Sequence, residues 1–290
     1  MGVDGTYWDM YRQNLLASHH IRYGATGGIG YYHVSDMYIA LYGNFISCGV
    51  HEGHYIFDGL IENGSDIQPE QIHGDTGAQN EIIFAFGLLL GIKIMPRIRN
   101  FKHLRYYKAS KEDHYKNIDP LFTDQSINWE LIKTHYSDML RTMMSIRWGK
   151  IKASTLLRKF NTKSRKNKLY FAFRELGRVE RTGFLLNYIN DVEWRQMIHA
   201  ATYKNEEFNQ FLGWTSFGDG GTIGDNMRYN QQKIIKFGYL VANMVMLHNV
   251  VNMTKGINAL REEGVATRLC HVRQYSSEMT EGPMILARYS

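Results

Sequence analysis

The chain contains three acidic residues whose local sequence suits a site for divalent cations. Asp4 lies in Val-Asp-Gly-Thr, Asp75 lies in His-Gly-Asp-Thr-Gly, and Glu206 lies in Tyr-Lys-Asn-Glu-Glu-Phe. Two strand acids joined by a helix acid would form an all-oxygen site, the ligand set that Mg²⁺ prefers. Two such ions, roughly 3.5–4 Å apart, can activate a nucleophile and stabilise the leaving oxygen in phosphodiester displacement. Spacing alone leaves rival acids open, namely Asp9, Asp36, Glu52, Asp58 and Glu207.

The residues on either side of Asp75 predict strands that alternate with helices. The expected strands are 28–35, 37–48, 71–75 and 92–98, and the expected helices are 52–63 and 81–90. The strands are marked by β-branched and aromatic residues, and the helices by apolar residues at helical spacing. The end of a strand in an open sheet is where ligand crevices form, and strand 71–75 ends on Asp75. This order predicts an α/β domain with a mixed sheet.

The pattern changes after residue 99. Residues 100–168 are predicted to be mainly helices joined by polar loops, with 129–144 the clearest helix, and we interpret them as a helical insertion. Helical periodicity returns over 169–209, and 234–253 forms another long apolar helix whose methionine and aromatic side chains we expect in the core. The chain is therefore divided into three parts. These are the first part of the α/β core at 1–99, the helical insertion at 100–168, and the helical remainder carrying Glu206 at 169–290.

Composition narrows the class of protein. The chain has 44% hydrophobic residues, enough to bury a core, and only two cysteines, which are far apart and form no zinc motif. The sequence has no unbroken run of 18 apolar residues, so we expect no membrane span. With 34 Lys and Arg against 28 Asp and Glu, the net charge is +6, a mild excess that raises the case for nucleic acid only modestly. A reducing cytoplasm is the expected compartment.

Basic residues concentrate in two segments. Segment 150–168 contains eight of them and no acid, namely Lys150, Lys152, Arg158, Lys159, Lys163, Arg165, Lys166 and Lys168. Such a run suits a DNA backbone, because clustered cations release condensed counterions, but a solvated link between helices explains it equally well. Segment 96–108 interleaves Phe101, Tyr106 and Tyr107 with Arg97, Arg99, Lys102, Arg105 and Lys108. That mixture can grip phosphates and stack on bases, or it can dock the segment onto the domain.

Several sequence blocks, in one order, resemble the catalytic domain of the Tn-three type replicative transposases. V-D-G-T at 3–6 is similar to the family's S-A-D-G, G-D-T-G at 74–77 to its T-D-T-G, and L-L-G-I-K-I-M-P-R-I-R at 89–99 to its L-L-G-F-x-x-x-P-R-I-R. K-N-E-E-F-N at 204–209 is similar to the family's K-x-E-x-x-x. Further matching blocks are S-D-M-Y at 35–38, F-D-G-L-I-E-N at 57–63, G-R-V-E-R-T at 177–182 and H-N-V-V at 248–251.

The resemblance implies a ribonuclease-H-like fold that carries a DDE triad of catalytic, metal-binding acids. Asp4, Asp75 and Glu206 match the triad, and Glu206 is preferred to Glu207 by its distance from Lys204. The implied cofactor is Mg²⁺ or Mn²⁺, as two ions, and the implied reactions are 3′-end nicking and strand transfer in cointegrate formation. DNA contacts are expected from ten basic residues. These are Arg97, Arg99, Lys102, Arg105, Arg158, Lys159, Arg165, Lys166, Arg178 and Arg181. For the arginines, packing and ion pairs are the alternative.

The chain also departs from the family. Members are longer and carry N-terminal domains that bind transposon ends, and after residue 273 the matching motifs are missing, so we expect a protein truncated at both ends with a shortened but central first strand. Two alternatives follow. One is an inactive remnant that binds DNA nonspecifically through 150–168, and the other is a different metal-dependent nuclease on the same fold. The resemblance further implies a bacterial mobile element, a cytoplasmic, nucleoid-associated location, no membrane contact, and a homo-oligomer for the full-length protein.

Overall fold

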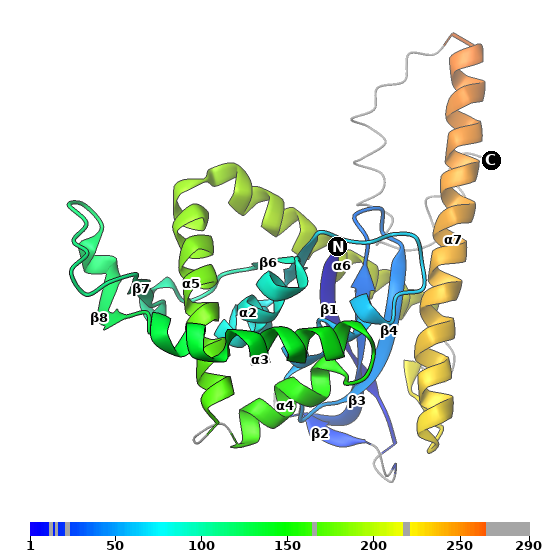
Figure 1. Ribbon diagram of the computed structural model, residues 1–290. Coiled ribbons are helices and arrows are strands. Elements are labelled where there is room, and N and C mark those ends of the chain that lie inside the picture. The colour runs from blue at the N-terminus through cyan, green and yellow to red at the C-terminus, as the bar shows by residue number, and fades with distance from the viewer. Residues whose placement is uncertain (12–13, 15–16, 21–23, 164–166, 217–220, 265–290) are drawn as a thin grey trace.

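The fold is described from a computed structural model. It describes residues 1–264 apart from 12–13, 15–16, 21–23, 164–166 and 217–220. A mixed sheet lies between two groups of helices (Figure 1). This confirms the α/β class and the mixed sheet predicted from the sequence.

Strand β1 (Gly2–Asp9) lies inside the sheet, where the sequence places its first strand. The sheet follows the order β2-β3-β1-β5-β6, with β4 paired to β3. The other strands are β2 (Ser18–His20), β3 (Ala25–Val34), β4 (Ala40–Ser47), β5 (Gln71–Gly74) and β6 (Lys93–Pro96). Strand β1 is antiparallel to β3 and parallel to β5, which is in turn parallel to β6. The carboxyl end of β5 therefore opens beside two neighbours that run in the same direction.

Alternation along β3 separates the core into two parts, because successive side chains of a strand point to opposite faces. Ile29 and Tyr31 belong to the cluster under α2 (Glu81–Leu90) and α5 (Lys168–Asn190). Tyr32 and Val34 belong to the cluster under α6 (Val192–Thr215) and α7 (Arg228–Glu262). Each part of the core is thus covered by its own helices, in keeping with a layered α/β domain.

Helix α2 forms at the predicted residues. Asn80 caps its first turn by accepting a hydrogen bond from the Ile82 amide at 2.8 Å, and Gly91 ends it with φ of 76°. Helix α5 crosses α2 at Gly177, where a Cβ atom would lie only 2.5 Å from the carbonyl carbon of Glu81. A glycine is therefore needed at this crossing, because any side chain would separate the two helices.

The predicted helix over 52–63 is wrong. The structure has a 3₁₀ turn, η1 (Glu52–Tyr55), followed by the single-turn helix α1 (Asp58–Ile61). Gly53 and Gly59 lower the helix propensity of this segment, and both pack closely, Gly53 against the carbonyl of Gly77 and Gly59 against the ring of His33. Strands β3 and β4 lie within three residues of their predicted bounds.

The predicted helical insertion is helical only in its second half. Helices α3 (Trp129–Arg147) and α4 (Ala153–Lys163) agree with the prediction, but residues 100–128 form a projecting arm (Figure 1). In that arm β7 (Tyr106–Lys108) pairs in parallel with β8 (Phe122–Ser126). The 3₁₀ turn η3 (Phe101–His103) precedes β7, and η4 (Asp119–Leu121) directly precedes β8. Packing of the Tyr106 ring on the Phe122 ring, at a centroid distance of 6.0 Å, joins the two strands in place of a helix.

The expectation that the methionine and aromatic side chains of 234–253 lie in the core is wrong for Phe237 and Met244, which are exposed, whereas Tyr239 and Met246 are partly buried and pack against the core. Helix α7 packs against β4 through Asn243, whose side chain hydrogen-bonds the backbone of Ala40 in both directions. Its other side exposes Ile234, Phe237, Leu240, Val241, Met244, Leu247, Val250 and Val251. The helix is long and apolar enough to cross a membrane by length and composition, with mean hydropathy 1.4 over its most apolar 18 residues, of which 11% are buried. One helix of this kind is weak grounds for a membrane protein.

The helical stretch 169–209 is split between α5 and α6 at Asp191, which caps α6 by accepting a hydrogen bond from the Trp194 amide.

Candidate functional site

Strand register brings Asp4 and Asp75 side by side. Val3 of β1 pairs with Gly74 of β5, and Asp4 and Asp75 are the next residue on each of these parallel strands. Gly74 in turn pairs with Pro96 of β6, so that Arg97 follows on the third strand, with its amide bonded to the Gly74 carbonyl at 2.8 Å. Two acids and one arginine therefore line up on three neighbouring parallel strands, where β5 and β6 end beside the middle of β1.

Asp75 leaves the sheet in an exposed turn. It caps the 3₁₀ turn η2 (Thr76–Gln79), where its Oδ1 accepts a hydrogen bond from the Gly77 amide at 3.3 Å. The side chain of Gln79 fastens the end of this turn by donating to the Arg97 carbonyl at 2.8 Å. The turn thus keeps the Asp75 carboxylate at the surface, in reach of a ligand.

Helix α6 carries Glu206 across β1. Asn205 packs directly on Gly2, where a Cβ atom would lie 2.6 Å from the Asn205 Cγ. One turn later, Asn209 Nδ2 donates to Asp4 Oδ2 at 3.0 Å. Glu206 lies between these two contacts and precedes Asn209 by three positions, which places it on the same side of the helix. Its carboxylate pairs with the Arg97 guanidinium at 3.6 Å.

The charges of the three acids act on one another. The pKa of Asp4 rises to about 6, chiefly because the carboxyl group is buried and also because Asp75 and Glu206 carry like charge nearby. Hydrogen bonds from the Gly5 amide and from Asn209 offset part of this rise. The effect on Asp4 shows that all three carboxylates share one neighbourhood, with Arg97 the basic residue paired within it.

The structure distinguishes Glu206 from its rival Glu207. Glu207 Oε2 accepts a hydrogen bond from the Tyr38 hydroxyl at 2.5 Å. The charge of Glu206, by contrast, contributes to the raised pKa of Asp4. Glu207 is therefore engaged with the turn before β4, and Glu206 is the acid of α6 that faces Asp4.

The donor set fits a hard divalent cation, although its members are not drawn into a closed cage. Among the residues that the structure describes, no group of three His, Cys, Asp or Glu side chains is close enough to form a metal cluster. Carboxylate oxygens are the ligands that Mg²⁺ and Mn²⁺ favour, and the raised pKa of Asp4 reflects negative charge that a cation would offset. Asn209 was missed in the sequence, where its spacing of three residues from Glu206 was the available signal.

The basic residues predicted to contact DNA fall into different settings. Arg99, Lys102 and Arg105 are exposed on the segment that leads from the site to the projecting arm, and Arg158 and Lys159 are exposed on α4. Arg165 and Lys166 lie outside the described residues. Lys152, from the same basic run, pairs with Glu62 at 2.6 Å. The DNA role of this set stays a prediction.

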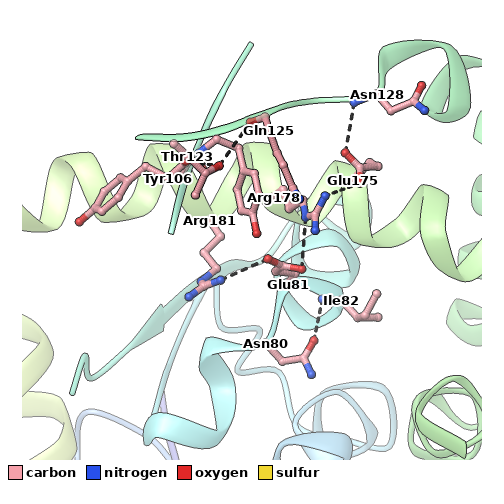
Figure 2. A network of polar contacts seen from close by, with 12 residues as sticks. Asn80, Glu81, Ile82, Tyr106, Thr123, Gln125, Asn128, Glu175, Arg178 and Arg181 are labelled. Carbon is pink, nitrogen blue, oxygen red and sulfur yellow. Dashed lines mark hydrogen bonds and ion pairs between the residues drawn. The ribbon is translucent and has the colours of Figure 1, made fainter. Parts of the chain in front are cut away.

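Arg178 and Arg181 are engaged elsewhere. Arg178 pairs with Glu175 at 2.6 Å and with Glu81 at 3.5 Å, and Arg181 pairs with Glu81 at 3.3 Å (Figure 2). Their side chains are 13% and 15% exposed. The arginines therefore join α5 to α2, and the ion-pair alternative raised from the sequence describes what the structure contains. Their predicted contact with DNA has no support in this geometry, because their charges are already paired in a largely shielded network.

The same network holds the arm. Glu175 Oε2 accepts a hydrogen bond from the Asn128 amide at 3.1 Å, and the Arg178 guanidinium lies over the Tyr107 ring at 4.4 Å (Figure 2 shows the first of these contacts). Asn128 itself caps α3. The network therefore fixes β7 and the start of α3 against the core.

Comparison with known proteins shows which family this chain belongs to. A family model described as Tn3 transposase DDE domain matches residues 1–282. The transposase for transposon Tn501 of Pseudomonas aeruginosa is 34% identical over 84% of this chain, and the transposase for transposon Tn3926 of Escherichia coli is 32% identical over 84%. Both matches cover 25% of the relative, so the chain spans about a quarter of the length of these proteins.

Proposed function

Because this chain belongs to the family of Tn3 transposase DDE domains, we propose that it forms the catalytic centre of a DNA transposase, in which Asp4, Asp75 and Glu206 are the catalytic acids. The observation that carries the proposal is the register of β1 and β5, which sets Asp4 beside Asp75, together with the side of α6 that brings Glu206 toward Asp4. Three remote acids thereby converge where the carboxyl end of β5 lies beside β1. Ligand crevices form at such ends in open sheets.

The proposed reactions are two phosphodiester displacements. Water first attacks the phosphorus at each transposon end, and the bond to the 3′ oxygen breaks to leave a free 3′-hydroxyl. That hydroxyl then attacks a phosphodiester of target DNA, forming a new bond as the target strand is cut. Repair by replication would resolve the product into a cointegrate. Both steps are nucleophilic displacements at phosphorus, a hydrolysis that leaves a 5′-phosphate and a 3′-hydroxyl and then a transesterification, so a single site can serve both.

The residues of the site have separable tasks. Two Mg²⁺ or Mn²⁺ ions, when bound, supply Lewis-acid activation of the nucleophile and stabilisation of the leaving oxygen. Asp4 and Asp75 provide fixed oxygen donors on neighbouring strands, and Glu206 adds a third from α6. Asn209 orients the Asp4 carboxylate through its 3.0 Å hydrogen bond. Arg97 is paired with Glu206 at 3.6 Å, close enough to contact a phosphate held beside the acids.

The proposed substrate is DNA, which would lie across the surface between the acid site and the projecting arm. Arg99, Lys102 and Arg105 are exposed along that path and suit contacts to the phosphate backbone. We place the reaction in the bacterial cytoplasm, where the chromosome lies. A homo-oligomer of the full-length protein, which acts on two transposon ends, belongs to the same proposal.

The test is strand transfer by the 290-residue chain. A labelled oligonucleotide with a free 3′-hydroxyl is mixed with plasmid DNA in Mg²⁺ or Mn²⁺, and both nicking and joining are followed on gels. Joining is expected with wild type, and Asp75→Asn is expected to lower it by roughly a thousandfold, because metal-dependent stabilisation of the transition state is worth several kcal/mol. Asp66→Asn, an exposed acid outside the site, is the matched control.

Two results would replace the proposal by its alternatives. Metal-dependent cleavage without joining would identify a nuclease on the same fold. Salt-sensitive DNA binding with no cleavage in either metal would identify an inactive remnant whose basic segments bind DNA nonspecifically.

A further inference from the structure

A fourth carboxylate lies beside the three acids. Glu52 is the first residue of η1, and its side chain reaches over Gly5, the residue that follows Asp4 on β1. A Cβ atom at residue 5 would lie 2.8 Å from the Glu52 Cδ. The glycine after Asp4 therefore leaves room for the Glu52 carboxyl group. Because successive residues of a strand face opposite sides, Glu52 reaches β1 from the side of the sheet opposite to α6, one residue past Asp4.

The turn that carries Glu52 is fastened to the turn that carries Asp75. Gly53, the next residue of η1, packs so closely on η2 that a Cβ atom there would lie 2.6 Å from the Gly77 carbonyl oxygen. His51, on the other side of Glu52, lies near Gly77 as well, and the Asp75 charge opposes the lowering of its pKa that burial causes. Glu52 and Asp75 are thus mounted on two turns in direct contact.

The buried side chain of Tyr31 is affected by the charges of the same acidic residues. Tyr31 pairs with Gly5 across the antiparallel register of β1 and β3, and it is 3% exposed. Burial is the main cause of its raised pKa, and the charges of Glu52, Asp4 and Asp75 each add to the rise. The charges of all three carboxylates therefore act on one buried phenol, in keeping with the direct contact between the turns that carry Glu52 and Asp75.

We propose that Glu52 is a positioning residue of the metal centre, whose carboxylate accepts hydrogen bonds from the water ligands of the ions bound by Asp4 and Asp75. This inference rests on the proposed function and assigns a residue outside the DDE triad. Outer ligand shells of this kind orient the bound groups, and their loss weakens metal affinity by about 10-fold to 100-fold. The extra negative charge also favours divalent cations over the unliganded state.

The experiment compares metal binding by wild type, Glu52→Gln and Asp75→Asn. Glutamine keeps the shape of Glu52 but removes its charge, so the fold is expected to stand. Mn²⁺ alone is titrated into the 290-residue chain without DNA, and binding is followed by electron paramagnetic resonance of free Mn²⁺ and by the melting temperature. Glu193→Gln, an exposed acid in the first turn of α6, is the matched control.

Glu52→Gln is expected to raise the half-saturating Mn²⁺ concentration about tenfold, while its melting temperature without metal stays at the wild-type value. In strand transfer, the same variant should need more metal for half-maximal rate and regain most of the wild-type rate at saturating metal. A purely structural role would lower the melting temperature without metal and would not be overcome by added Mn²⁺.

The outcomes separate the two proposals. If Glu52→Gln titrates like wild type while Asp75→Asn loses the response, the role of Glu52 is refuted and the proposed function stands. If wild type itself neither binds Mn²⁺ nor joins DNA, the proposed function fails and the inference fails with it. Glu52→Asp, which retracts the charge by one methylene, should give an intermediate affinity.

Discussion

The molecule has two clusters of charged side chains, one between α2 and α5 and one where β5 and β6 end beside β1, and they are built in opposite ways. In the cluster of Glu81, Glu175, Arg178 and Arg181, two carboxylates meet two guanidinium groups, and the side chains are shielded from solvent. In the acid site, Asp4, Asp75 and Glu206 are joined by Arg97 as the paired base, and Asp75 is exposed. The first cluster is balanced in charge and the second is not.

The difference indicates which cluster is built for a ligand. A buried ion pair with all its partners present holds elements together, and losing one member leaves an uncompensated charge. An excess of carboxylates is relieved by a cation. The pKa of Asp4 is raised to about 6, mainly by burial and further by the like charges of Asp75 and Glu206. The balanced cluster therefore has a structural role and the acid site is suited to bind a cation. Removing a charge should destabilise the protein in the balanced cluster and stabilise the metal-free protein in the acid site.

The largest expected effect is on the balanced cluster. Arg178→Ala should lower the free energy of unfolding by about 3–5 kcal/mol, because Glu81 and Glu175 would keep their charges without this partner. Chemical denaturation monitored by circular dichroism gives the value. Arg141→Ala, which removes an exposed pair with Asp138, is the control and should cost less than about 1 kcal/mol. Equal losses in the two variants would contradict a structural role for the network.

In the acid site, removing a charge should stabilise the metal-free protein. Asp4→Asn is expected to raise the free energy of unfolding at pH 8 by about 3 kcal/mol, since the raised pKa makes the charged form costly in the folded state. For wild type, protonation of Asp4 favours folding below its unfolded value of 3.8, and this contribution is lost as pH rises through about 6. The advantage of Asp4→Asn should therefore shrink as pH falls from 8 to 4. Thermal melts in chelator across this range measure it, and a variant less stable than wild type at pH 8 would overturn the assignment.

The smallest expected effect separates an arginine of the site from one of the balanced cluster. Arg97→Ala should weaken binding to duplex DNA severalfold and reduce the slope of log affinity against log salt by about 0.9, the value of one phosphate contact. Arg181→Lys keeps the charge near Glu81 and should leave that slope unchanged. Fluorescence anisotropy at several salt concentrations provides both numbers. If Arg97→Ala leaves the slope of log affinity against log salt unchanged, Arg97 does not contact the phosphate backbone.

Local sequence predicted the place of Asp75 at the end of a short strand, and the sheet class followed from the alternation of elements. Asp4 and Glu206 were singled out from rival acids only by the family resemblance. The pairing of Arg178 with Glu81 could not be inferred, because residues far apart in sequence meet only when α5 crosses α2. Asn209 was missed for a related reason, since its amide gains a role only after α6 is laid over β1.

Apolar composition does not reveal which side of α7 is buried. Its many Val, Leu and Met residues show that the helix avoids charge, but they do not tell which side faces the sheet or how wide that side is. Asn243, Tyr239 and Ala242 make the contacts with β4 and the core, while larger apolar side chains such as Phe237 remain exposed. In the arm, Tyr106 and Phe122 have the composition of short strands, yet the polar residues between them resembled loops between helices.

The close packing of α2 and α5 at a glycine limits which substitutions these two helices can accept. Gly177 sets how near the two helix axes come, and Arg178 departs from the next position toward Glu81. A methyl group at residue 177 would push the two helices apart and lengthen the ion pairs that Arg178 and Arg181 make with Glu81. Drift at residues 81, 177 and 178 is therefore expected to be concerted, with a bulkier residue at one position accepted only alongside a compensating exchange at another.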